Sequence, residues 1–526
     1  MIATSQYTVQ HVPLPQTQQF GQLFLDFLAQ KEWLAPLHGH YPSVFNFEKQ
    51  IALKQGFSSD SRNTLTQVLR EQYANITVSP EVSNNIEALL QPNTFTITTG
   101  HQLNIFTGPL YFIYKIVTVI NVSQKLSEQF PQYNFVPVYW AATEDHDAAE
   151  INHFNLFGKK YEWTTAQTGA VGRFSTEGLG DLLDTLPERF ELFEKAYREH
   201  RSLSEATCIF INELFGNQGL VMLDADHAAF KKALRPVMQQ DIFEQLTQKQ
   251  TATAQTLLEA NGHKPQIHIR EINFFYLDKN VRERIVKDGE TYRTLNTDLV
   301  WTTAQMAELI ENSPEKLSPN VSLRPVYQEL ILPNLSYTGG AAEVAYWLQL
   351  KPVFDALHLP YPILLPRNFV LFITAANAKK ISKLELSQDD IWRDEASLKQ
   401  QYLAEVGAEF SAEIIQKQIQ QLFEQLGTQA AQADKTLQDF VKAEAARTEK
   451  IVEGIEKRVR KAEEKKHETA INQIISLKQK LFPNGGLQER SENFLNYYAN
   501  NPLFIKQLLE TIDPFRIEFH VLTESI

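Results

Sequence analysis

The sequence predicts an α/β protein that combines a doubly wound parallel sheet with a long antiparallel helical coiled coil. Three short apolar runs are typical of buried strands, and helical or mixed segments separate them. From about Leu384 the composition changes to Gln, Glu, Lys and Ala, with apolar residues spaced three and four apart. At 526 residues, the chain is long enough for more than one structural unit.

The sheet prediction rests on the runs Thr94–Thr99, Phe135–Ala142 and Tyr361–Leu365. Between the first two lies a helical pattern over Leu110–Leu126, and Pro109 suits the first turn of that helix, where a missing N–H costs nothing. A polar motif follows each run directly. Because ligands of such sheets bind beyond the carboxyl ends of the strands, we expect a site there.

The rest of the chain is assigned around this core. Helices are predicted over Phe20–Gln30, Ser61–Tyr73, Leu182–His200 and Ala228–Ala260, and strands over Gln266–Leu277, Phe369–Ala376 and Phe515–Leu522. The expected organisation is a helical region over 1–90, core halves over 91–154 and 321–383, an insertion over 155–320, a coiled coil over 384–482 and an α/β tail over 483–526.

An apolar stripe supports the coiled coil. It consists of Ile415, Ile419, Leu422, Leu426, Ala433, Leu437 and Phe440, continued by Val452, Ile455, Val459 and Ala462. The mixed charges over 447–467 are typical of a solvated helix face, and Pro483 ends the pattern. Because an unpartnered stripe would be exposed, we expect a homodimer through residues 385–475.

Composition excludes several classes of protein. The formal charge of −13 makes nucleic acid an unlikely partner, because phosphate-backbone binding needs dense Lys and Arg. No signal peptide or membrane-spanning run is present, so a soluble cytoplasmic protein is expected. Cys208, the single cysteine, excludes an intramolecular disulfide and a thiolate-rich zinc site. Its apolar surroundings favour a buried hydrophobe over a catalytic thiol.

The first polar cluster follows Thr99 and contains Gly100, His101, Gln102, Thr107, Gly108, Tyr111 and Lys115. A strand, a glycine loop and a helix in that order favour an anion cradle, because glycine lets backbone N–H groups approach a phosphate or carboxylate. Neither a P-loop nor a GxGxxG fingerprint is present, so an ordinary tight turn is the alternative. For Lys115 the alternative is an ion pair with a carboxylate.

The second cluster follows Ala142 and contains Glu144, Asp145, His146, Asp147, Glu150, Asn152 and His153. Three interpretations stay open: the carboxylates hold Mg²⁺, His146 acts as a general base near neutral pH, or the acidic residues cap a helix start. His146 and His153 are seven residues apart, too far for the adjacent-turn pair of a zinc helix.

The third cluster contains Arg324, Gln328, Gly339, Gly340, Glu343 and Tyr346, with Arg367 after the third strand. Arg324 offers a planar fork for a carboxylate or phosphate. The glycine pair precedes an apparent helix, which favours a second anion-binding turn. Glu343 has the alternative of a simple helix-start acid.

Together the clusters resemble the cysteine ligase family of bacillithiol biosynthesis (BshC type). The matching stretches are Gly100-His101-Gln102 with Thr107–Lys115, Pro137–Trp140 with Glu144–Asp147 and Glu150–His153, Arg324-Pro325 with Gly339-Gly340, Glu343 and Tyr346-Trp347, and Leu487–Arg490. The family has Gln where this chain has His101, so a titratable group stands in place of an amide.

The resemblance implies a nucleotide-binding, Rossmann-like core with connecting-peptide insertions and a coiled coil that forms homodimers. It also implies a reaction that adds cysteine to the amine of glucosaminyl-malate, forming an amide and yielding bacillithiol. Activating the cysteine carboxyl calls for ATP or another nucleotide, with Mg²⁺ as a candidate companion, and no zinc is expected.

Three expectations complete the sequence-based hypothesis. His146, flanked by Asp145 and Asp147, is the expected base for the sugar amine, and His101 is its rival. The three clusters should converge on one cleft, and Asp226-His227, which looks like a surface turn, should lie outside it. The alternative functions are a nucleotidyltransferase or metal-assisted hydrolase on the same core, and a non-catalytic coiled-coil scaffold.

Overall fold

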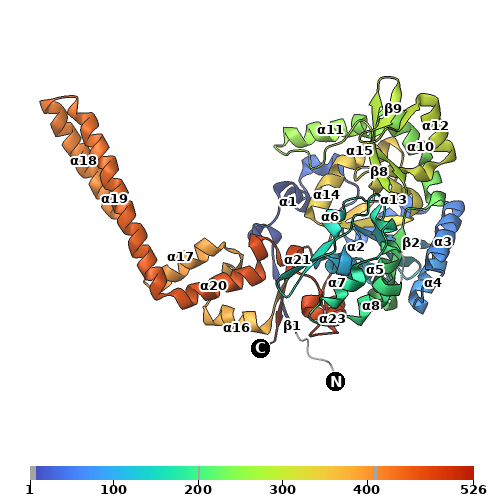
Figure 1. The fold of residues 1–526 in the computed structure, drawn as a ribbon, viewed down its shortest axis with the longest axis horizontal. Coiled ribbons are helices and arrows are strands. Elements are labelled where there is room, and N and C mark those ends of the chain that lie inside the picture. Colours follow the sequence, from blue (N-terminus) through green and yellow to red (C-terminus); the bar gives the residue numbers. More distant parts are fainter. Residues whose placement is uncertain (1–6, 200–201, 408–410, 526) are drawn as a thin grey trace. The chain divides into compact units, whose positions relative to one another are not determined.

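The computed structural model describes residues 7–199, 202–407 and 411–525, and it divides into two units (Figure 1). The core unit comprises Val9–Leu371 and Glu489–Val521. The helical unit is formed mainly by Phe372–Gln488. Among the described residues, no helix combines the length and the apolar character needed to cross a bilayer.

A five-stranded parallel sheet organises the core unit. Its strands, in spatial order, are β13 (Ile363–Pro366), β12 (Asn334–Gly339), β2 (Thr94–His101), β3 (Asn134–Ala141) and β6 (Val221–Asp224). Counted along the chain, the first strand of this sheet is β2 and the fourth is β12. These two strands lie side by side, and the strand order reverses between them. This is the doubly wound arrangement, so the predicted fold class is confirmed. Strands β6 and β12 were not predicted.

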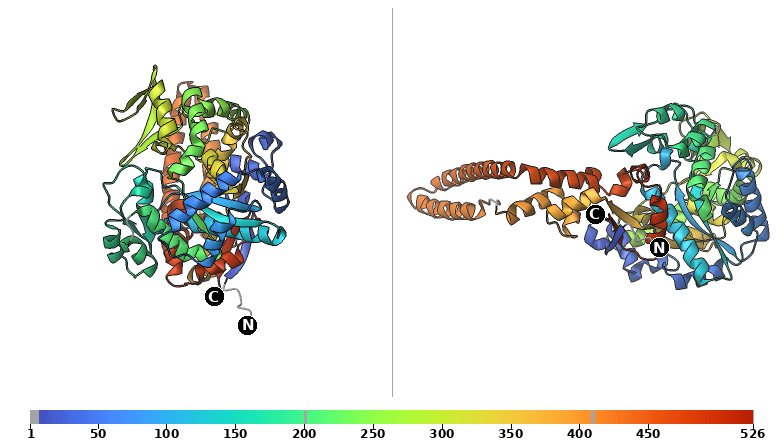
Figure 2. Two further views of the ribbon diagram at one scale, coloured as in Figure 1. Left: turned by 90° about the vertical axis from the view of Figure 1, so that its right-hand side faces the viewer. Right: turned by 90° about the horizontal axis from the view of Figure 1, so that it is seen from below.

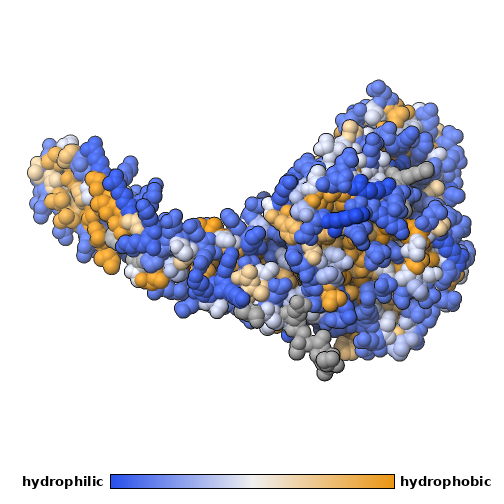
Figure 3. All heavy atoms as spheres, turned by 60° about the horizontal axis from the view of Figure 1, so that its bottom comes forward, coloured by the Kyte–Doolittle hydropathy of each residue, from blue (hydrophilic) through white to orange (hydrophobic). Residues whose placement is uncertain are grey.

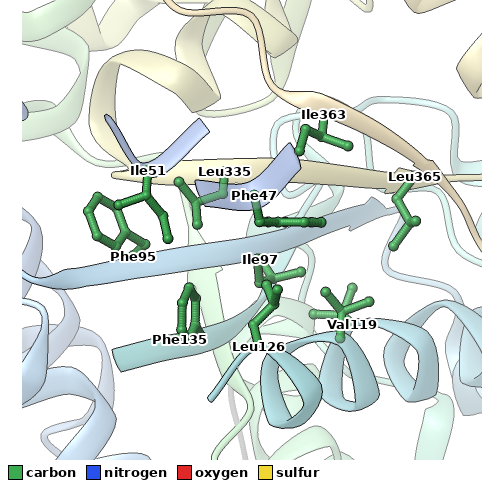
Figure 4. Close-up of a cluster of buried hydrophobic side chains, with 11 residues drawn as sticks. Phe47, Ile51, Phe95, Ile97, Val119, Leu126, Phe135, Leu335, Ile363 and Leu365 are labelled. Carbon is green, nitrogen blue, oxygen red and sulfur yellow. The ribbon is translucent and has the colours of Figure 1, made fainter. Parts of the chain in front are cut away.

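Two helices cover one face of this sheet and form a dry core with it (Figure 4). Phe47 and Ile51 come from α2 (Val44–Lys54), and Val119 and Leu126 come from α5 (Tyr111–Gln129). The strands contribute Phe95, Ile97, Phe135, Leu335, Ile363 and Leu365. Burying this apolar surface fixes the sheet, and with it the positions at which the strands end.

Two predicted helix starts differ from the structure. Helix α3 (Ser59–Tyr73) begins two residues before the predicted Ser61, because the Ser58 hydroxyl accepts a hydrogen bond from the Ser61 N–H and caps it. Helix α5 begins at Tyr111, so Pro109 precedes the helix and the prediction that it lies in the first turn is wrong.

The remaining elements of the N-terminal part and the second core half surround the sheet. They are α1 (Gln22–Leu28), α4 (Pro80–Ala88), α6 (Ala148–Ile151), α13 (Arg324–Ile331), α14 (Ala341–Trp347) and α15 (Lys351–Ala356), with the hairpin β4 (His153–Leu156) and β5 (Lys159–Glu162). Helix α6 follows the second polar cluster directly, and α14 follows the glycine pair of the third.

The insertion contains an antiparallel sheet, which Figure 2 shows in yellow and green. Its order is β10 (Val300–Thr302), β9 (Thr291–Thr294), β8 (Val281–Asp288), β7 (Phe274–Asp278) and β11 (Leu317–Pro319). The predicted strand over Gln266–Leu277 thus begins only at Phe274. The insertion also contains six α-helices: α7 (Leu179–Asp184), α8 (Glu191–Glu199), α9 (Leu203–Phe215), α10 (Ala228–Glu244), α11 (Leu246–Ala260) and α12 (Thr303–Asn312), counted over its described residues.

Two long helices predicted in the insertion are each broken in two. The predicted helix over Ala228–Ala260 divides at Gln245, whose φ of 57° lies in the left-handed region and ends α10. The predicted helix over Leu182–His200 is replaced by α7 and α8, and its last residue lies outside the described residues.

The helical unit contains the predicted antiparallel hairpin, which the right panel of Figure 2 shows in orange and red. Its two arms are α18 (Glu413–Ala433) and α19 (Leu437–Lys466), and α16 (Ala375–Lys383), α17 (Glu395–Glu405) and α20 (Glu468–Leu481) complete the unit.

Strands β1 (Tyr7–Val12), β15 (Phe519–Glu524) and β14 (Phe369–Ile373) form a third sheet in that order, and α21 (Gln488–Ser491), α22 (Leu495–Tyr498) and α23 (Phe504–Thr511) lie between α20 and β15 along the chain.

Candidate functional site

A cleft of about 760 Å³ opens in the core unit where β2, β3 and β12 end. Gly100 lines it from the first polar cluster, His146 from the second and Gly340 from the third. The prediction that the three clusters converge on one cleft is therefore confirmed. The physical reason is the strand order, because β2 and β12 are neighbours at the reversal point and their carboxyl ends open a crevice there.

An ion pair between the buried Lys115 and the partly exposed Glu343 lines the cleft. Lys115 Nζ lies 2.6 Å from Glu343 Oε2 and also donates a hydrogen bond to the Gly100 carbonyl at 2.8 Å. Glu343 further accepts from the Tyr337 hydroxyl and the Gly340 N–H. Burial opposes ionisation of Glu343, but Lys115 and these donors outweigh it and lower its pKa to about 2.

This arrangement decides the two predicted glycine cradles. The Gly340 N–H, which would have contacted an anion, already donates to Glu343 at 2.9 Å. Gly100 instead lets the Arg324 side chain approach the backbone closely, because a Cβ there would lie 3.1 Å from Arg324 Nη1. Cationic side chains, rather than glycine N–H groups, therefore carry the anion-binding capacity of the cleft.

Arg324 lies in the cleft wall between two phenols. Its Nη2 donates to the hydroxyls of Tyr337 and Tyr346 at 3.2 and 3.1 Å, and its Nη1 donates to Gln328 Oε1 at 3.2 Å. Within the described residues it has no carboxylate partner at ion-pairing distance. Arg324 therefore remains a candidate for binding an anionic ligand through its planar guanidinium.

Arg367 differs from that expectation. Its guanidinium donates to both carboxylate oxygens of Glu489, at 2.8 and 2.5 Å, and both side chains are buried. The charge that the sequence offered to a ligand is neutralised by a residue 122 positions away. Arg367 still lines the cleft, where its guanidinium lies over the Tyr111 ring.

His101 is a neutral histidine in the cleft wall. Its ring stacks on Phe112 with centroids 5.0 Å apart, and its buried Nε2 has no hydrogen-bond partner among the described residues. Burial and the nearby cation Lys115 lower its pKa well below the usual value, so it is uncharged at neutral pH. Gln102 and Tyr111 line the cleft beside it.

The acidic loop Glu144–Asp147 does not form a metal site in this structure. Glu144 turns inward to the buried Lys231 of α10, which also donates to the Leu317 carbonyl at 2.7 Å. The Asp147 carboxylate caps α6 by accepting from the Glu150 N–H at 3.1 Å. Among the described residues, no group of three or more His, Cys, Asp or Glu side chains is placed to hold a metal ion.

His146 contacts a residue that the sequence did not suggest. Arg282 Nη1 lies 2.7 Å from His146 Nδ1, and Asp145 Oδ1 lies 3.5 Å from the same ring nitrogen. Arg282 comes from β8 of the insertion, so one wall of the cleft is built by that subdomain. His146 is 46% exposed and lines the cleft.

Several predicted residues lie beside the cleft without lining it. Thr107 and Gly108 do not line it, and Asn104 occupies the space where a Cβ of Gly108 would lie. Asn152 and His153 contact each other at the start of β4. Asp147, Gln328 and Gly339 do not line it either, but each accepts a hydrogen bond from a residue that does. The donors are Glu150, Arg324 and Arg367, respectively.

The insertion supplies the residues that sequence reasoning missed. Arg270, Arg282, Arg284 and His268 all line the cleft. The run of charged residues Arg282-Glu283-Arg284 was the available signal, and all three side chains line the cleft. Arg490, quoted only as part of a motif, lines the cleft as well.

The charges give the cleft a preference for anions. Seven cationic side chains line it (Lys115, Arg270, Arg282, Arg284, Arg324, Arg367 and Arg490) against five carboxylates (Glu144, Asp145, Glu150, Glu283 and Glu343). In the described part of the chain, Arg270, Arg284, Arg324 and Arg490 have no carboxylate within ion-pairing distance. An acidic protein therefore carries a cleft suited to a ligand with several negative charges.

Two further expectations concern residues outside the cleft. Asp226 and His227 do not line it: Arg173 donates to both carboxylate oxygens of Asp226, and His227 caps α10. The pair is half-buried and held by these contacts, so its description as a surface turn is wrong. Cys208 is buried on α9, as predicted.

Comparison with known proteins agrees with this architecture. Residues 7–368 match the family model described as "Bacillithiol biosynthesis BshC, N-terminal Rossmann-like domain", and residues 370–524 match "Bacillithiol biosynthesis BshC, C-terminal coiled-coil domain". A protein of Flavobacterium johnsoniae named "Putative cysteine ligase BshC" is 42% identical, with 96% of this chain and 97% of the relative covered. Relatives of the same name from Cytophaga hutchinsonii and Chlorobaculum tepidum are 40% and 29% identical, covering 97% and 96% of this chain and 98% and 97% of their own lengths.

Proposed function

The chain belongs to the bacillithiol-biosynthesis BshC family, and from that premise we propose that it is a ligase that joins cysteine to glucosaminyl-malate and yields bacillithiol. In this reaction the sugar amine attacks the activated carboxyl carbon of cysteine. A C–N bond forms, the activating group leaves with its electron pair, and the ammonium proton passes to a base. The protein would act in the cytoplasm.

One observation supports this substrate most directly. Four guanidinium groups of the cleft have no carboxylate partner among the described residues, and the malyl part of the substrate carries two carboxylates. Arg270 and Arg284 belong to the insertion, whereas the Arg324 guanidinium lies 5.1 Å from the centroid of the Tyr337 ring and that of Arg490 lies 5.9 Å from the centroid of the Tyr111 ring. Planar guanidinium forks suit carboxylates and phosphates equally, so two anionic groups can be held at once.

We assign the two arginine pairs to different parts of the reaction. Arg270 and Arg284 would hold the malyl carboxylates, and Arg324 and Arg490 would hold the phosphates of ATP or another nucleotide. That nucleotide would supply the activation of the cysteine carboxyl, with Mg²⁺ carried on its phosphates rather than in a cage of protein carboxylates. His101, His146 and Glu150 line the cleft as candidates for the base.

The test of this proposal is reconstitution. Pure protein is incubated with glucosaminyl-malate, cysteine and ATP, and mass spectrometry follows bacillithiol together with AMP and ADP. The ligase proposal expects bacillithiol only when all three are present, and the nucleotide product identifies the activation chemistry. Nucleotide turnover without the amine, and with no amide formed, would favour the hydrolase or nucleotidyltransferase alternative instead.

The arginine assignment has its own test. The double variant Arg270→Ala, Arg284→Ala should raise KM for glucosaminyl-malate by roughly 100-fold or more, because each of the two lost charge-assisted contacts costs about 1.5–3 kcal/mol and about 1.4 kcal/mol corresponds to tenfold. KM for cysteine and for ATP should change little. Arg293→Ala is the matched control, since that arginine of β9 pairs with Asp288 and does not line the cleft. Equal effects on all three KM values would contradict the assignment.

A further inference from the structure

We propose that Arg282 holds His146 in the tautomer that carries its proton on Nε2, so that His146 acts in the cleft as a hydrogen-bond donor and not as the base. For its catalytic part, this inference rests on the proposed ligase function. The histidine would touch the reacting groups, and Arg282 would be a positioning residue that acts through it.

The first step concerns the Arg282 side chain. An arginine guanidinium is always a donor, since it has five N–H groups and no acceptor. Arg282 Nη1 lies 2.7 Å from His146 Nδ1, which is a direct hydrogen-bond distance. Nδ1 must therefore be the acceptor, because two facing N–H groups at that separation would leave a hydrogen atom without a partner.

The second step concerns how firmly Arg282 is placed. Its Nε donates to the Ser318 hydroxyl at 3.2 Å and its Nη2 donates to the Pro319 carbonyl at 3.2 Å. Its guanidinium also lies 4.1 Å from the centroid of the Phe275 ring, and only 8% of the side chain is exposed. Two of its nitrogens are thus anchored on β11, and the Phe275 ring of β7 lies against the guanidinium, so the fold itself places Nη1 beside His146 Nδ1.

Asp145 also lies near His146 Nδ1, where a carboxylate favours a protonated ring nitrogen. Asp145 Oδ1 lies 3.5 Å from Nδ1, whereas Arg282 Nη1 is 0.8 Å closer. The carboxylate is already used by the His146 backbone N–H, which donates to it at 2.7 Å. Asp145 therefore neutralises Arg282 at 3.8 Å and does not orient a protonated Nδ1.

The consequence is chemical. With Nδ1 occupied, a neutral His146 carries its proton on Nε2, and it has no lone pair left to accept a proton from the sugar amine. In the described residues Nε2 has no protein partner, so its N–H is free to donate to the negative charge that develops on the carbonyl oxygen of cysteine during attack. Glu150, which lines the same cleft and has no side-chain hydrogen-bond donor among the described residues, and His101 remain as candidates for the base.

Two substitutions of His146 separate the roles. His146→Gln keeps an N–H donor near the position of Nε2 but cannot accept a proton, and His146→Ala removes both functions. A donor role predicts that the glutamine variant keeps at least about a tenth of the turnover while the alanine variant loses roughly 10²–10³-fold, the usual cost of a lost transition-state donor. Equal losses in the two variants would overturn the donor role, and urea unfolding of each variant checks that it still folds.

A spectroscopic measurement tests the tautomer without turnover. In protein labelled with ¹⁵N-histidine, with the His146 signals assigned by their absence from His146→Gln, a protonated Nε2 and an unprotonated Nδ1 are expected at pH 7.5. Arg282→Met should shift both nitrogens toward a tautomer mixture and lower turnover about 10-fold or more, whereas Arg293→Met should leave both unchanged. A protonated Nδ1 in the unmodified protein would overturn the inference, and failure of the ligase assay alone would overturn the proposed function instead.

Discussion

At the residue scale, three ion pairs connect the elements that surround the cleft. Lys115 joins Glu343 to the end of β2, Lys231 joins Glu144 to the insertion, and Arg367 joins the end of β13 to Glu489. Removing one member of such a pair leaves an uncompensated charge in a poorly solvated place, which costs about 3–5 kcal/mol. In the first of these pairs, Lys115 lowers the pKa of the Glu343 carboxyl against the opposing effect of burial.

Lys115→Met gives a prediction with a defined sign. In the unmodified protein the Glu343 pKa is lowered to about 2, so the stability that its ionised form contributes is fully present above pH 4.5 and is lost as pH falls through that lowered value. Without Lys115, burial dominates and raises the Glu343 pKa. The variant should therefore be less stable than the unmodified protein at pH 7 and should gain stability between pH 7 and pH 5.

Urea unfolding at the two pH values measures this change. The control is the double variant Lys115→Met, Glu343→Gln, which removes the unpaired charge and should recover part of the stability at pH 7 without the gain toward pH 5. A single variant whose stability changes between pH 7 and pH 5 no differently from that of the unmodified protein would show that Glu343 is not held ionised by Lys115.

Cys208 gives a second residue-scale prediction. Burial is the main cause that raises its thiol pKa, to about 12, although a hydrogen bond with Tyr73 acts in the other direction. At pH 8 the thiolate that reacts with alkylating reagents is therefore almost absent. Iodoacetamide should leave the native protein unlabelled by intact mass and should label it once in urea, and Cys208→Ala should keep ligase turnover. Labelling of the native protein with parallel loss of turnover would support the alternative that Cys208 is a catalytic thiol.

At the scale of elements, the hairpin of α18 and α19 does not bury its own apolar stripe. Leu422, Phe440 and Ile455 are 54, 62 and 53% exposed, and α19 has no buried residue. Figure 3 shows hydrophobic residues gathered along one side of this hairpin. Because such a stripe of leucine and phenylalanine is rarely left in water, we propose that the hairpin of a second copy covers it.

The dimer predicts a defined effect of charge on the stripe. Leu422→Glu with Phe440→Glu should convert a dimer into a monomer, measured by light scattering at micromolar concentration, because burying two carboxylates costs more than the remaining apolar contact returns. Gln420→Glu, a change at an exposed polar position of α18, should leave the dimer intact. A monomeric mass for the unmodified protein would contradict the proposed dimer.

At the scale of the whole molecule, an acidic chain surrounds a cationic cleft. The formal charge is −13, yet cations outnumber carboxylates among the side chains that line the cleft. Charges that are far apart are screened by salt over a Debye length of about 10 Å at 0.1 M, whereas contacts inside the cleft are screened much less. The local field of the cleft, rather than the net charge, therefore decides which ligands enter.

Salt should affect the two organic substrates differently. Between 50 and 300 mM NaCl, KM for glucosaminyl-malate should rise several-fold, because two carboxylates are held by arginines, whereas KM for the zwitterion cysteine should change less. In Arg270→Ala, Arg284→Ala the salt effect on glucosaminyl-malate should be flatter. Identical salt effects on both substrates would show that the arginines do not select the dicarboxylate.

The amino-acid sequence alone determined the elements whose signals are local. The β-branched run over 94–99 and the apolar stripe of the coiled coil each depend on residues close together in the chain, and both are present in the structure, whereas Gly100 and Gly339 lie within strands β2 and β12 rather than in separate turns. The convergence of the three clusters followed from the same signals, because the carboxyl ends of parallel strands meet at one edge of a sheet. His146 was placed correctly at that edge.

Only the tertiary structure decided which charges remain available to a ligand. Glu144, Arg367 and His146 meet partners that lie 87, 122 and 136 positions away. No local pattern marks such a pair, because an ion pair or hydrogen bond depends on how closely two atoms approach in space and on how little water separates them. For that reason the sequence could place the histidine in the cleft, but it could not give the contact with Arg282, from which we infer which ring nitrogen holds the proton.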